Sequence, residues 1–382
     1  MPEKRLKVMT ILGTRPEIIR LSRVMARLDQ YTDHILVHTG QNYDYELNEI
    51  FFTELQVRKP DYFLSVDTSS LGRAIGDIIA KSEPVMIKEK PDALLILGDT
   101  NSSLAAIIGK RLKIPIFHME AGNRCFDFNV PEEINRRIID HISDFNLVYT
   151  EHARRNLLAE GLPARKIYLT GSPLNEVLHY YLDRIKSAAA LPALALKPGQ
   201  YFLLSVHREE NVDHPQNLRA ILDTLQRIVQ VFDLPIMVST HPRTRQRLEK
   251  YPEILDQPRI VFHKPFGFFD YCQLQLNAFC VISDSGSISE EASILGFPAI
   301  TIRNALERPE AMDSGNIVLT GLDTQTVIDA ISLVTQEKDA QAKDPIPAEY
   351  AIPNTSRRVV KLILGTARLA HRWSGIVTWA AC

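Results

Sequence analysis

The chain has 382 residues, of which 45% are hydrophobic and 24% are charged. This length and composition are typical of a globular protein with two domains, and they exclude a disordered or fibrous chain. Lys and Arg number 44 against 46 Asp and Glu, so the formal charge is −2, and no general positive field would attract nucleic acid or an anionic membrane. An anionic ligand would therefore have to be bound by local groups.

The amino-terminal segment predicts neither a signal peptide nor a spanning helix. Its apolar run ends at Leu12, where Gly-Thr-Arg-Pro-Glu follows, and the run is too short for either. We therefore expect a cytoplasmic protein without membrane insertion. The Cys residues at 125, 272, 280 and 382 form no CxxC pair, and no His stands at metal-ligand spacing. Free thiols are expected rather than disulfides or a metal site.

Short apolar runs alternate with helical stretches, which is the pattern of parallel sheets covered by helices. The runs are residues 8–12, 34–38, 93–97, 114–118, 146–150, 201–206, 234–239, 259–262, 279–282 and 299–302. They predict an α/β protein of two Rossmann-like domains with a central cleft. We expect the first domain over 1–171 and the second over 172–365, with a C-terminal helix in 366–382 that packs back on the first. The Ala- and Pro-rich stretch 187–200 suits a connector.

Polar residues follow strands in both halves of the chain, at the strand ends where open parallel sheets bind ligands. They occupy 13–17, 39–42, 98–102, 119–122, 207–211, 240–243 and 283–287. A single such loop would indicate little, because strand-to-helix turns favour Gly, Ser, Thr and Asp. The repetition over both halves predicts one shared cleft.

Two of these loops have the pattern of an anion site. Gly286, between Ser285 and Ser287, lets the backbone approach a ligand, and a helix that starts there would direct N–H groups at a phosphate. The alternative is a capping box, Ser287-x-x-Glu290, which needs no ligand. Glu291 would then be placed to accept the hydroxyls of a ribose.

The loop at 13–17 offers Arg15 for a two-point grip on a diphosphate. The alternatives are a solvated surface Arg and a second capping box, Thr14-x-x-Glu17. Because the loop lacks GxGxxG, a nicotinamide cofactor is not supported.

Carboxylates are the candidates for proton transfer. Asp99 and Glu120 follow strands of the first domain, while Glu132 and Glu133 open a helical segment, where acidic residues also serve as plain helix-start signals. Carboxyl groups that converge in a dry cleft raise one another's pKa and can then donate protons near neutral pH. His207, after the first strand of the second domain, either faces the same space or is structural.

His241 and Arg243 add basic groups at another strand end, or they only begin a charged helix. There is no Asp-x-Asp pair and no cluster of His, so Arg, His and backbone N–H groups, not a divalent ion, are expected to neutralise the anion.

Eight motifs in order carry a family resemblance: Gly-Thr-Arg-Pro-Glu, His-Thr-Gly-Gln, Gly-Asp-Thr, His-Met-Glu-Ala-Gly-Asn-Arg, Pro-Glu-Glu-x-Asn-Arg, His-Arg-Glu-Glu-Asn, Ser-Asp-Ser-Gly-x-x-x-Glu-Glu and Arg-Pro-Glu. The chain resembles the non-hydrolysing UDP-N-acetylglucosamine 2-epimerases over nearly its whole length. The resemblance implies a GT-B-like fold, no cofactor, a homodimer, and UDP held mainly by the second domain.

The resemblance also implies the roles of individual residues. The catalytic set would be Asp99, Glu120, Glu132 and His207. The residues expected to bind the UDP-sugar are Arg15, Arg20, Gln41, Asn42, Arg136, Arg208, His241, Arg243, Phe266, Ser285, Gly286, Ser287, Glu291 and Arg308. The chain departs from the family at Arg20, where a Lys is often found, so a compact ammonium is replaced by a planar fork.

Residues 38–49 and 266–271 resemble a narrower branch, which converts UDP-N-acetyl-L-talosamine to UDP-N-acetyl-L-fucosamine for capsule or O-antigen polysaccharide. The substrate would then be a 6-deoxy sugar, and Phe266, Phe268 and Phe269 could face its methyl group or the uracil. Core packing of these rings is the alternative.

The expected chemistry is elimination and re-addition of UDP. The C2 hydrogen of an N-acetylamino sugar is not adjacent to a carbonyl, so a base alone would generate a poor carbanion, and loss of UDP from C1 gives a 2-acetamido glycal instead. Three rival functions remain: a GT-B glycosyltransferase, a nucleotide-sugar sensor without turnover, and interconversion of UDP-N-acetylglucosamine and UDP-N-acetylmannosamine.

Overall fold

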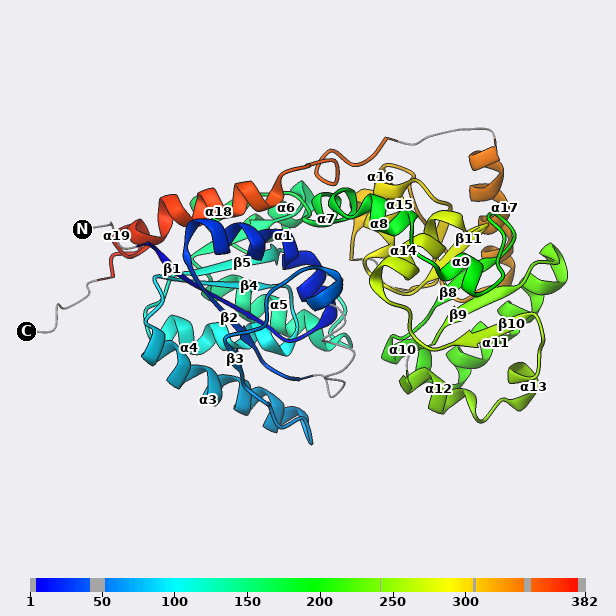
Figure 1. The fold of residues 1–382 in the computed structure, drawn as a ribbon, viewed down its shortest axis with the longest axis horizontal. Coiled ribbons are helices and arrows are strands. Elements are labelled where there is room, and N and C mark those ends of the chain that lie inside the picture. The colour runs from blue at the N-terminus through cyan, green and yellow to red at the C-terminus, as the bar shows by residue number, and fades with distance from the viewer. Residues whose placement is uncertain (1–4, 42–51, 241, 305–306, 340–344, 377–382) are drawn as a thin grey trace, which may run out of the picture. The chain divides into compact units, whose positions relative to one another are not determined.

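The computed structural model describes residues 5–41, 52–240, 242–304, 307–339 and 345–376 (Figure 1). The chain divides into two compact units, Met1–His179 with Glu349–Cys382, and Tyr180–Ala348.

The expected domain boundaries are therefore wrong. The chain leaves the first unit between His179 and Tyr180, not between 171 and 172, and it returns at Glu349, not at 366. Hydrogen bonds explain the early return, because the backbone N–H and the hydroxyl of Ser356 donate to the Glu176 carboxylate at 2.7 and 2.6 Å. This contact joins the segments before and after the second unit.

Seven parallel strands form the first sheet among the described residues, in the order β3-β2-β1-β4-β5-β6-β7. These strands are β1 (Lys7–Leu12), β2 (Asp33–His38), β3 (Tyr62–Phe63), β4 (Ala93–Leu97), β5 (Ile116–Ala121), β6 (Phe145–Val148) and β7 (Ile167–Leu169). The accompanying helices are α1 (Arg15–Tyr31), α3 (Leu71–Glu89), η1 (Asn101–Ala105), α4 (Ala106–Arg111), α5 (Pro131–Ile142), α6 (Glu151–Ala159), η2 (Ala164–Lys166), α7 (Leu174–Tyr180), α18 (Thr355–Thr366), η3 (Ala367–Leu369) and α19 (Ala370–Trp373).

Helices cover both faces of this sheet, which explains why its strands are apolar throughout. Met9 and Ile11 of β1 point into the core under α3 and α4, while the alternate residues Val8 and Leu12 are equally buried on the other side. Helices α1 and α18 run side by side over that second face (Figure 1), linked by a 3.2 Å hydrogen bond from Arg27 to Ser356.

The described part of the second unit contains a parallel sheet of six strands, in the order β10-β9-β8-β11-β12-β13. These strands are β8 (Phe202–Ser205), β9 (Ile236–Ser239), β10 (Ile260–His263), β11 (Cys280–Ser283), β12 (Ala299–Thr301) and β13 (Val318–Leu319). The helices are α8 (Leu182–Lys186), α9 (Ala190–Ala193), α10 (Glu209–Val212), α11 (Pro215–Phe232), α12 (Pro242–Leu248), α13 (Pro252–Leu255), α14 (Phe268–Asn277), α15 (Ile288–Leu295), α16 (Pro309–Asp313) and α17 (Thr324–Asp339). The core of this unit lies between the sheet and helices α11 and α17.

No helix within the described ranges is long and apolar enough to span a bilayer. Three of the four cysteines, Cys125, Cys272 and Cys280, are buried free thiols, as the spacing predicted.

The buried carboxylate of Glu17 stabilises the turn between β1 and α1 by accepting hydrogen bonds. Glu17 accepts hydrogen bonds from the N–H groups of Gly13 and Thr14 at 3.0 and 2.8 Å and from the Thr14 hydroxyl at 2.8 Å. Its other oxygen accepts from the Thr100 hydroxyl at 3.1 Å. A side chain on Gly13 would collide with Thr39 and Ser102, whose oxygens lie 2.0 and 2.3 Å from an ideal Cβ. The loops after β1, β2 and β4 therefore meet around Gly13, and Glu17 bonds the first and the last of them.

Replacing Glu17 should change how stability depends on pH. Burial raises the pKa of Glu17 from its ordinary 4.5 to about 7, although the hydrogen bonds oppose the shift. Between these values the folded chain keeps a proton that the unfolded chain loses, so stability falls as pH rises, by roughly 3 kcal/mol from this group. Chemical unfolding of Glu17→Gln at pH 5 and pH 7.5 should show a flatter pH dependence than wild type.

The matched control is Glu83→Gln on the exposed side of α3, which should keep the wild-type slope. An unchanged slope in Glu17→Gln would contradict the prediction.

Candidate functional site

Helix α5 fixes Asp99 at the carboxyl end of β4. The Arg136 guanidinium lies 2.6 Å from the Asp99 carboxylate, and the Asn135 amide donates to the Asp99 carbonyl at 2.9 Å. Both the backbone and the side chain of Asp99 are therefore positioned by consecutive residues of one helix. The predicted catalytic residue Asp99 and the predicted binding residue Arg136 form an ion pair that a substrate would meet as a unit.

Glu120 is the penultimate residue of β5 and has a strained backbone conformation. Its φ is +64°, a left-handed value that costs energy for any residue other than Gly, and the register with β6 shifts at this point. The resulting bulge turns the carboxylate out of the sheet, where Asn123 donates to it at 3.3 Å and the Arg20 Nε lies 3.9 Å away. The strain indicates that the direction of this side chain matters.

Arg20 is buried beside Glu120, with its guanidinium 5.8 Å from the centre of the Tyr149 ring. A planar cation can stack on the ring face while it faces the carboxylate. The replacement of the family Lys at this position therefore keeps a positive charge next to Glu120.

The two acidic residues that open α5 have different surroundings. Glu133 is fully buried, where its carboxylate faces Arg136 and Arg137 at 3.2 and 3.0 Å. Glu132 is half-buried in the first turn of the helix. Glu133 is thus structural, and Glu132 is the more accessible of the two.

A buried group that the sequence did not reveal supports the loop before Asp99. The His118 ring lies 2.8 Å from the Gly98 carbonyl through Nε2 and 2.9 Å from Asp140 through Nδ1. Burial would raise the pKa of Asp140, but His118 and Arg124 outweigh it and hold the pKa below its ordinary value. An ionised carboxylate therefore lies beneath the catalytic edge. The only sequence signal was polar residues inside predicted apolar elements.

In the second unit, Asp284 anchors the loop after β8. It is fully buried and accepts from the N–H groups of His207 and Arg208 at 3.1 and 3.0 Å and from the Asn211 amide at 3.1 Å. The His207 Nδ1 lies 3.2 Å from the same carboxylate, while 45% of the His207 side chain is exposed. Asp284 thus orients His207 and leaves the ring's other nitrogen accessible, a geometry suited to proton transfer.

Two arginines predicted to bind substrate are already paired with carboxylates. Arg208 lies 3.2 Å from Glu307, and Arg303 lies 3.0 Å from the other oxygen of the same carboxylate. Arg308 forms a buried ion pair with Glu290. Any anion bound here would meet these cations with part of their charge neutralised.

The predicted capping box at the start of α15 does not form. Ser287 has helical backbone angles and no capping hydrogen bond from its side chain, because Glu290 pairs with Arg308 instead. The hydroxyls of Ser285 and Ser287 bond each other at 3.0 Å. The purely structural explanation of this motif as a helix cap is therefore removed.

Gly286 and Glu291 complete this strand end. A Cβ on Gly286 would lie 3.0 Å from the Glu307 carboxylate, so the backbone here comes close to that side chain. Glu291 is half-buried and accepts from the Gln275 amide at 2.5 Å.

The other residues predicted to bind the UDP-sugar lie shortly after strands or outside the described residues. Arg15 and Gln41 are half-buried after β1 and β2. Asn42 and His241 lie outside the described residues, as does the side chain of Arg243 on α12.

For two of the three phenylalanines, the structure agrees with the alternative of core packing. Phe268 and Phe269 are buried, and Arg184 lies over the Phe269 ring at 4.4 Å, so these rings pack in the core of the unit rather than facing a ligand. Phe266 is half-buried and stacks on His263 at 4.3 Å between ring centres.

No group of three or more His, Cys, Asp or Glu suited to a metal ion occurs in the residues that the structure describes. Arg136, Arg208 and Arg308 are among the described residues predicted to bind the UDP-sugar that carry positive charge.

Comparison with known proteins identifies the family. The profile described as UDP-N-acetylglucosamine 2-epimerase matches residues 26–364. The structure of UDP-N-acetylglucosamine 2-epimerase from Rickettsia bellii superimposes with a TM-score of 0.90 at 48% identity, covering 96% of this chain and 98% of the other. The Methanocaldococcus jannaschii enzyme in complex with UDP-GlcNAc and UDP superimposes with a TM-score of 0.88 at 35% identity, covering 94% and 99%.

A further relative differs in its sugar. The UDP-2,3-diacetamido-2,3-dideoxy-D-glucuronate 2-epimerase of Pseudomonas aeruginosa is 36% identical over 330 residues, which cover 85% of this chain and 91% of the relative.

The predicted fold class of two Rossmann-like, GT-B-like α/β domains is confirmed. Asp99, Glu120 and Arg136 lie at the carboxyl edge of one domain, and His207 lies at that of the other. Together with the profile match, these features show that the chain belongs to the non-hydrolysing UDP-N-acetylglucosamine 2-epimerase family and is an isomerase that acts on UDP-sugars.

Proposed function

We propose that the chain epimerises C2 of a UDP-N-acetyl sugar by eliminating and re-adding UDP. The observation that carries this proposal is the arrangement at the ends of the adjacent strands β4 and β5, where Asp99 pairs with Arg136 and the strained Glu120 lies near Arg20. Two carboxylates, each next to a fixed cation, can act on one carbon from different directions. Glu132 and the oriented His207 complete the proposed catalytic set.

In the elimination step, one carboxylate takes the C2 proton. The electron pair of the C2–H bond forms the C1–C2 double bond, and the C1–O bond breaks with its pair leaving on the UDP oxygen. The return step reverses this: an acid delivers a proton to the opposite face of C2, and the UDP oxygen bonds to C1. Arginines near the diphosphate would stabilise the charge that develops on the leaving group.

The UDP moiety is proposed to bind at the strand ends of the second unit. Support comes from the open start of α15 at Ser285–Ser287 and from Glu291, which could accept ribose hydroxyls. The Methanocaldococcus jannaschii relative was solved with UDP-GlcNAc and UDP.

For the sugar, we propose UDP-2-acetamido-2,6-dideoxy-L-talose, which would become UDP-N-acetyl-L-fucosamine for capsule or O-antigen synthesis in the cytoplasm. This choice rests on the sequence resemblance of residues 38–49 and 266–271, of which Phe266 alone among the three phenylalanines is partly exposed. UDP-N-acetylglucosamine is the second candidate, because the matching profile and the two solved relatives carry that name.

A side-by-side assay in D₂O tests both the reaction and the sugar. The purified chain is given each UDP-sugar separately, and the products are analysed by NMR. Epimerisation predicts deuterium at C2 of the product. The proposed sugar predicts that the talose derivative is turned over at least tenfold faster than UDP-N-acetylglucosamine. The reverse preference would select the second candidate.

The same assay distinguishes epimerisation from sugar transfer and from binding without chemistry. Transfer of the sugar to an acceptor without deuterium at C2 would indicate a glycosyltransferase, and UDP-sugar binding without turnover would indicate a sensor. Either outcome would overturn the proposal.

Loss of one proton-transfer group should reduce turnover without abolishing substrate binding. For Asp99→Asn and Glu120→Gln we expect kcat to fall by roughly 10²–10⁴-fold, while calorimetric affinity for UDP changes little, because UDP is assigned to the other unit. Glu83→Gln provides the matched control and should keep wild-type kcat. Variants with normal kcat would remove these carboxylates from the mechanism.

We also propose that the chain forms a homodimer through an apolar patch on the first unit. Phe126 and Phe128 are 68% and 67% exposed, and Ile134 and Ile138 of α5 are 51% and 38% exposed. The two isoleucines are four residues apart and lie on the outer face of the helix. Such a cluster of exposed rings and aliphatic side chains is typical of a protein contact.

The double variant Ile134→Glu with Ile138→Glu should convert the dimer to a monomer, because opposing carboxylates would have to be buried at the contact. Analytical ultracentrifugation gives the mass directly. Leu158→Glu, which changes an exposed leucine of α6, is the control and should leave the dimer intact. A dimer that persists in the double variant would place the contact elsewhere.

A further inference from the structure

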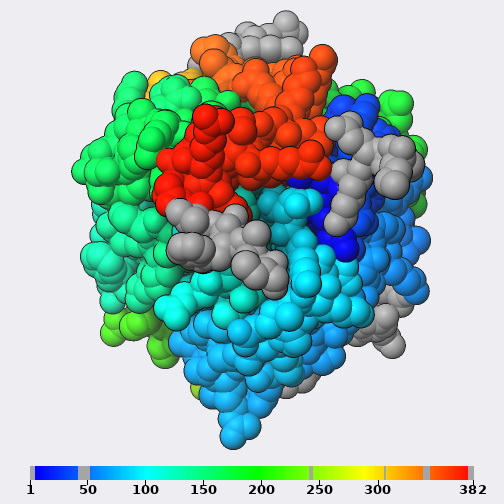
Figure 2. Space-filling view, turned by 90° about the vertical axis from the view of Figure 1, so that its left-hand side faces the viewer, coloured from blue at the N-terminus to red at the C-terminus, as the bar shows by residue number. Residues whose placement is uncertain are grey.

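A hollow of about 570 Å³ lies at the edge of the first sheet opposite the catalytic residues. It is bordered by the end of α3, the loops before β4 and β5, and the C-terminal segment of η3 and α19, which is drawn in red beside the cyan part of the first unit (Figure 2). Since β4 is five residues long, this edge is about 16 Å from Asp99. The hollow is therefore separate from the proposed site of epimerisation, and it lies within one unit.

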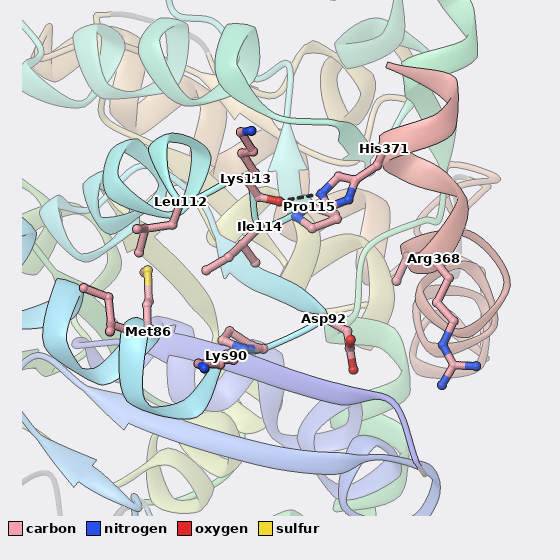
Figure 3. Close-up of a pocket in the computed structure, with 12 residues that line it drawn as sticks. Met86, Lys90, Asp92, Leu112, Lys113, Ile114, Pro115, Arg368 and His371 are labelled. Carbon is pink, nitrogen blue, oxygen red and sulfur yellow. Dashed lines mark hydrogen bonds between the residues drawn. The ribbon is translucent and has the colours of Figure 1, made fainter. Parts of the chain in front are cut away.

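The walls combine an apolar floor with a basic rim. Figure 3 shows Met86 and Lys90 along one side of the hollow, and Leu112, Lys113 and His371 along the other. Lys90 and Lys113 are exposed. Figure 3 draws the Lys113 ammonium turned away from Met86, and its flexible stem would let it turn toward the opening.

The rim has an excess of positive charge. Its one carboxylate, Asp92, accepts the backbone N–H of Lys7 at 2.8 Å. Among the residues that the structure describes, no carboxylate lies within ion-pair distance of the Lys90 ammonium. An anion in the hollow would therefore meet the Lys90 ammonium without competition from a paired carboxylate.

Both lysines occupy backbone positions that favour glycine. Lys90 ends α3 with φ +49°, and Lys113 has φ +60° in the loop before β5. A left-handed conformation costs an L-residue on the order of 1 kcal/mol, and glycine would avoid that cost at either position. Two long cationic side chains at the rim of one hollow, each at an unfavourable position, point to a role for their charge.

A hydrogen bond holds the outer wall in place. The His371 ring donates through Nε2 to the Lys113 carbonyl at 2.5 Å (Figure 3). The returning C-terminal segment is thereby joined to the loop that carries the second lysine, so the hollow has a fixed wall on each side.

We propose that this hollow binds a small amphiphilic anion, in which a phosphate group meets Lys90 and Lys113 and a short apolar body lies on Met86, Leu112 and Ile114. The volume suits a small metabolite. The site is additional to the proposed epimerase function and does not depend on it.

The test uses hexyl phosphate as the probe, below its micelle concentration, and isothermal titration calorimetry of the full chain. Saturable binding is expected, and it should persist in saturating UDP because the two sites are separate. Inorganic phosphate and hexanol, which each lack one half of the probe, should bind at least tenfold more weakly.

The informative variant is Lys90→Gly with Lys113→Gly. It removes both ammonium groups and relieves both left-handed conformations, so the melting temperature should stay level or rise while hexyl phosphate binds at least tenfold more weakly. Gln56→Gly, at another exposed left-handed position in the same unit, is the control and should bind as wild type does.

Three results would overturn the proposal: no saturable binding of hexyl phosphate to wild type, displacement of the probe by UDP, or unchanged binding in the double glycine variant.

Discussion

Buried carboxylates that accept several hydrogen bonds hold the ligand-facing loops of both units. A carboxyl group is costly to bury unless hydrogen-bond partners surround it, and the chain meets this condition by directing loop N–H groups and side chains at each one. Glu17 joins the loops after β1 and β4, Asp140 lies under the loop that leads to Asp99, and Asp284 fixes His207 and Arg208. Because each carboxylate accepts hydrogen bonds from several donors, removing one carboxylate would free more than one loop segment.

The same arrangement separates structural from reactive acids. Glu133 and Asp140 are fully enclosed by arginine and histidine partners, whereas Asp99, Glu120 and Glu132 are partly accessible. Along the chain, Glu132 and Glu133 are adjacent and chemically equivalent. Their different surroundings follow from the helical rotation between neighbouring residues, which turns one toward the core and the other toward the ligand edge.

Local patterns predicted ten of the thirteen strands that the structure describes, and the polar strand ends, because apolar runs and turn residues are short-range signals. The strands that the patterns missed, β3, β7 and β13, are only two or three residues long. Residue 120 is an example of a polar strand end: its position after an apolar run marked it as a candidate, but nothing local indicated the bulge that aims it. The hydrogen-bond and ion-pair partners of buried groups could not be predicted from the sequence either, because they come from residues that are distant along the chain. His118 contacts Asp140 only because β5 and α5 pack together. The capping box predicted between Ser287 and Glu290 does not form because Glu290 pairs with Arg308. The domain boundary was misplaced because the hydrogen bonds from Ser356 to Glu176 join residues far apart in sequence.

The return of the chain at Glu349 makes the first unit discontinuous, while Tyr180–Ala348 is a single stretch. During synthesis, α1 would therefore emerge long before α18, the helix that covers its face of the sheet. The second unit could complete its core while the first still exposed apolar surface near Arg27, and closing that surface would wait for Ser356 to leave the ribosome. Vectorial folding of this chain is thus expected to finish with the unit that began first.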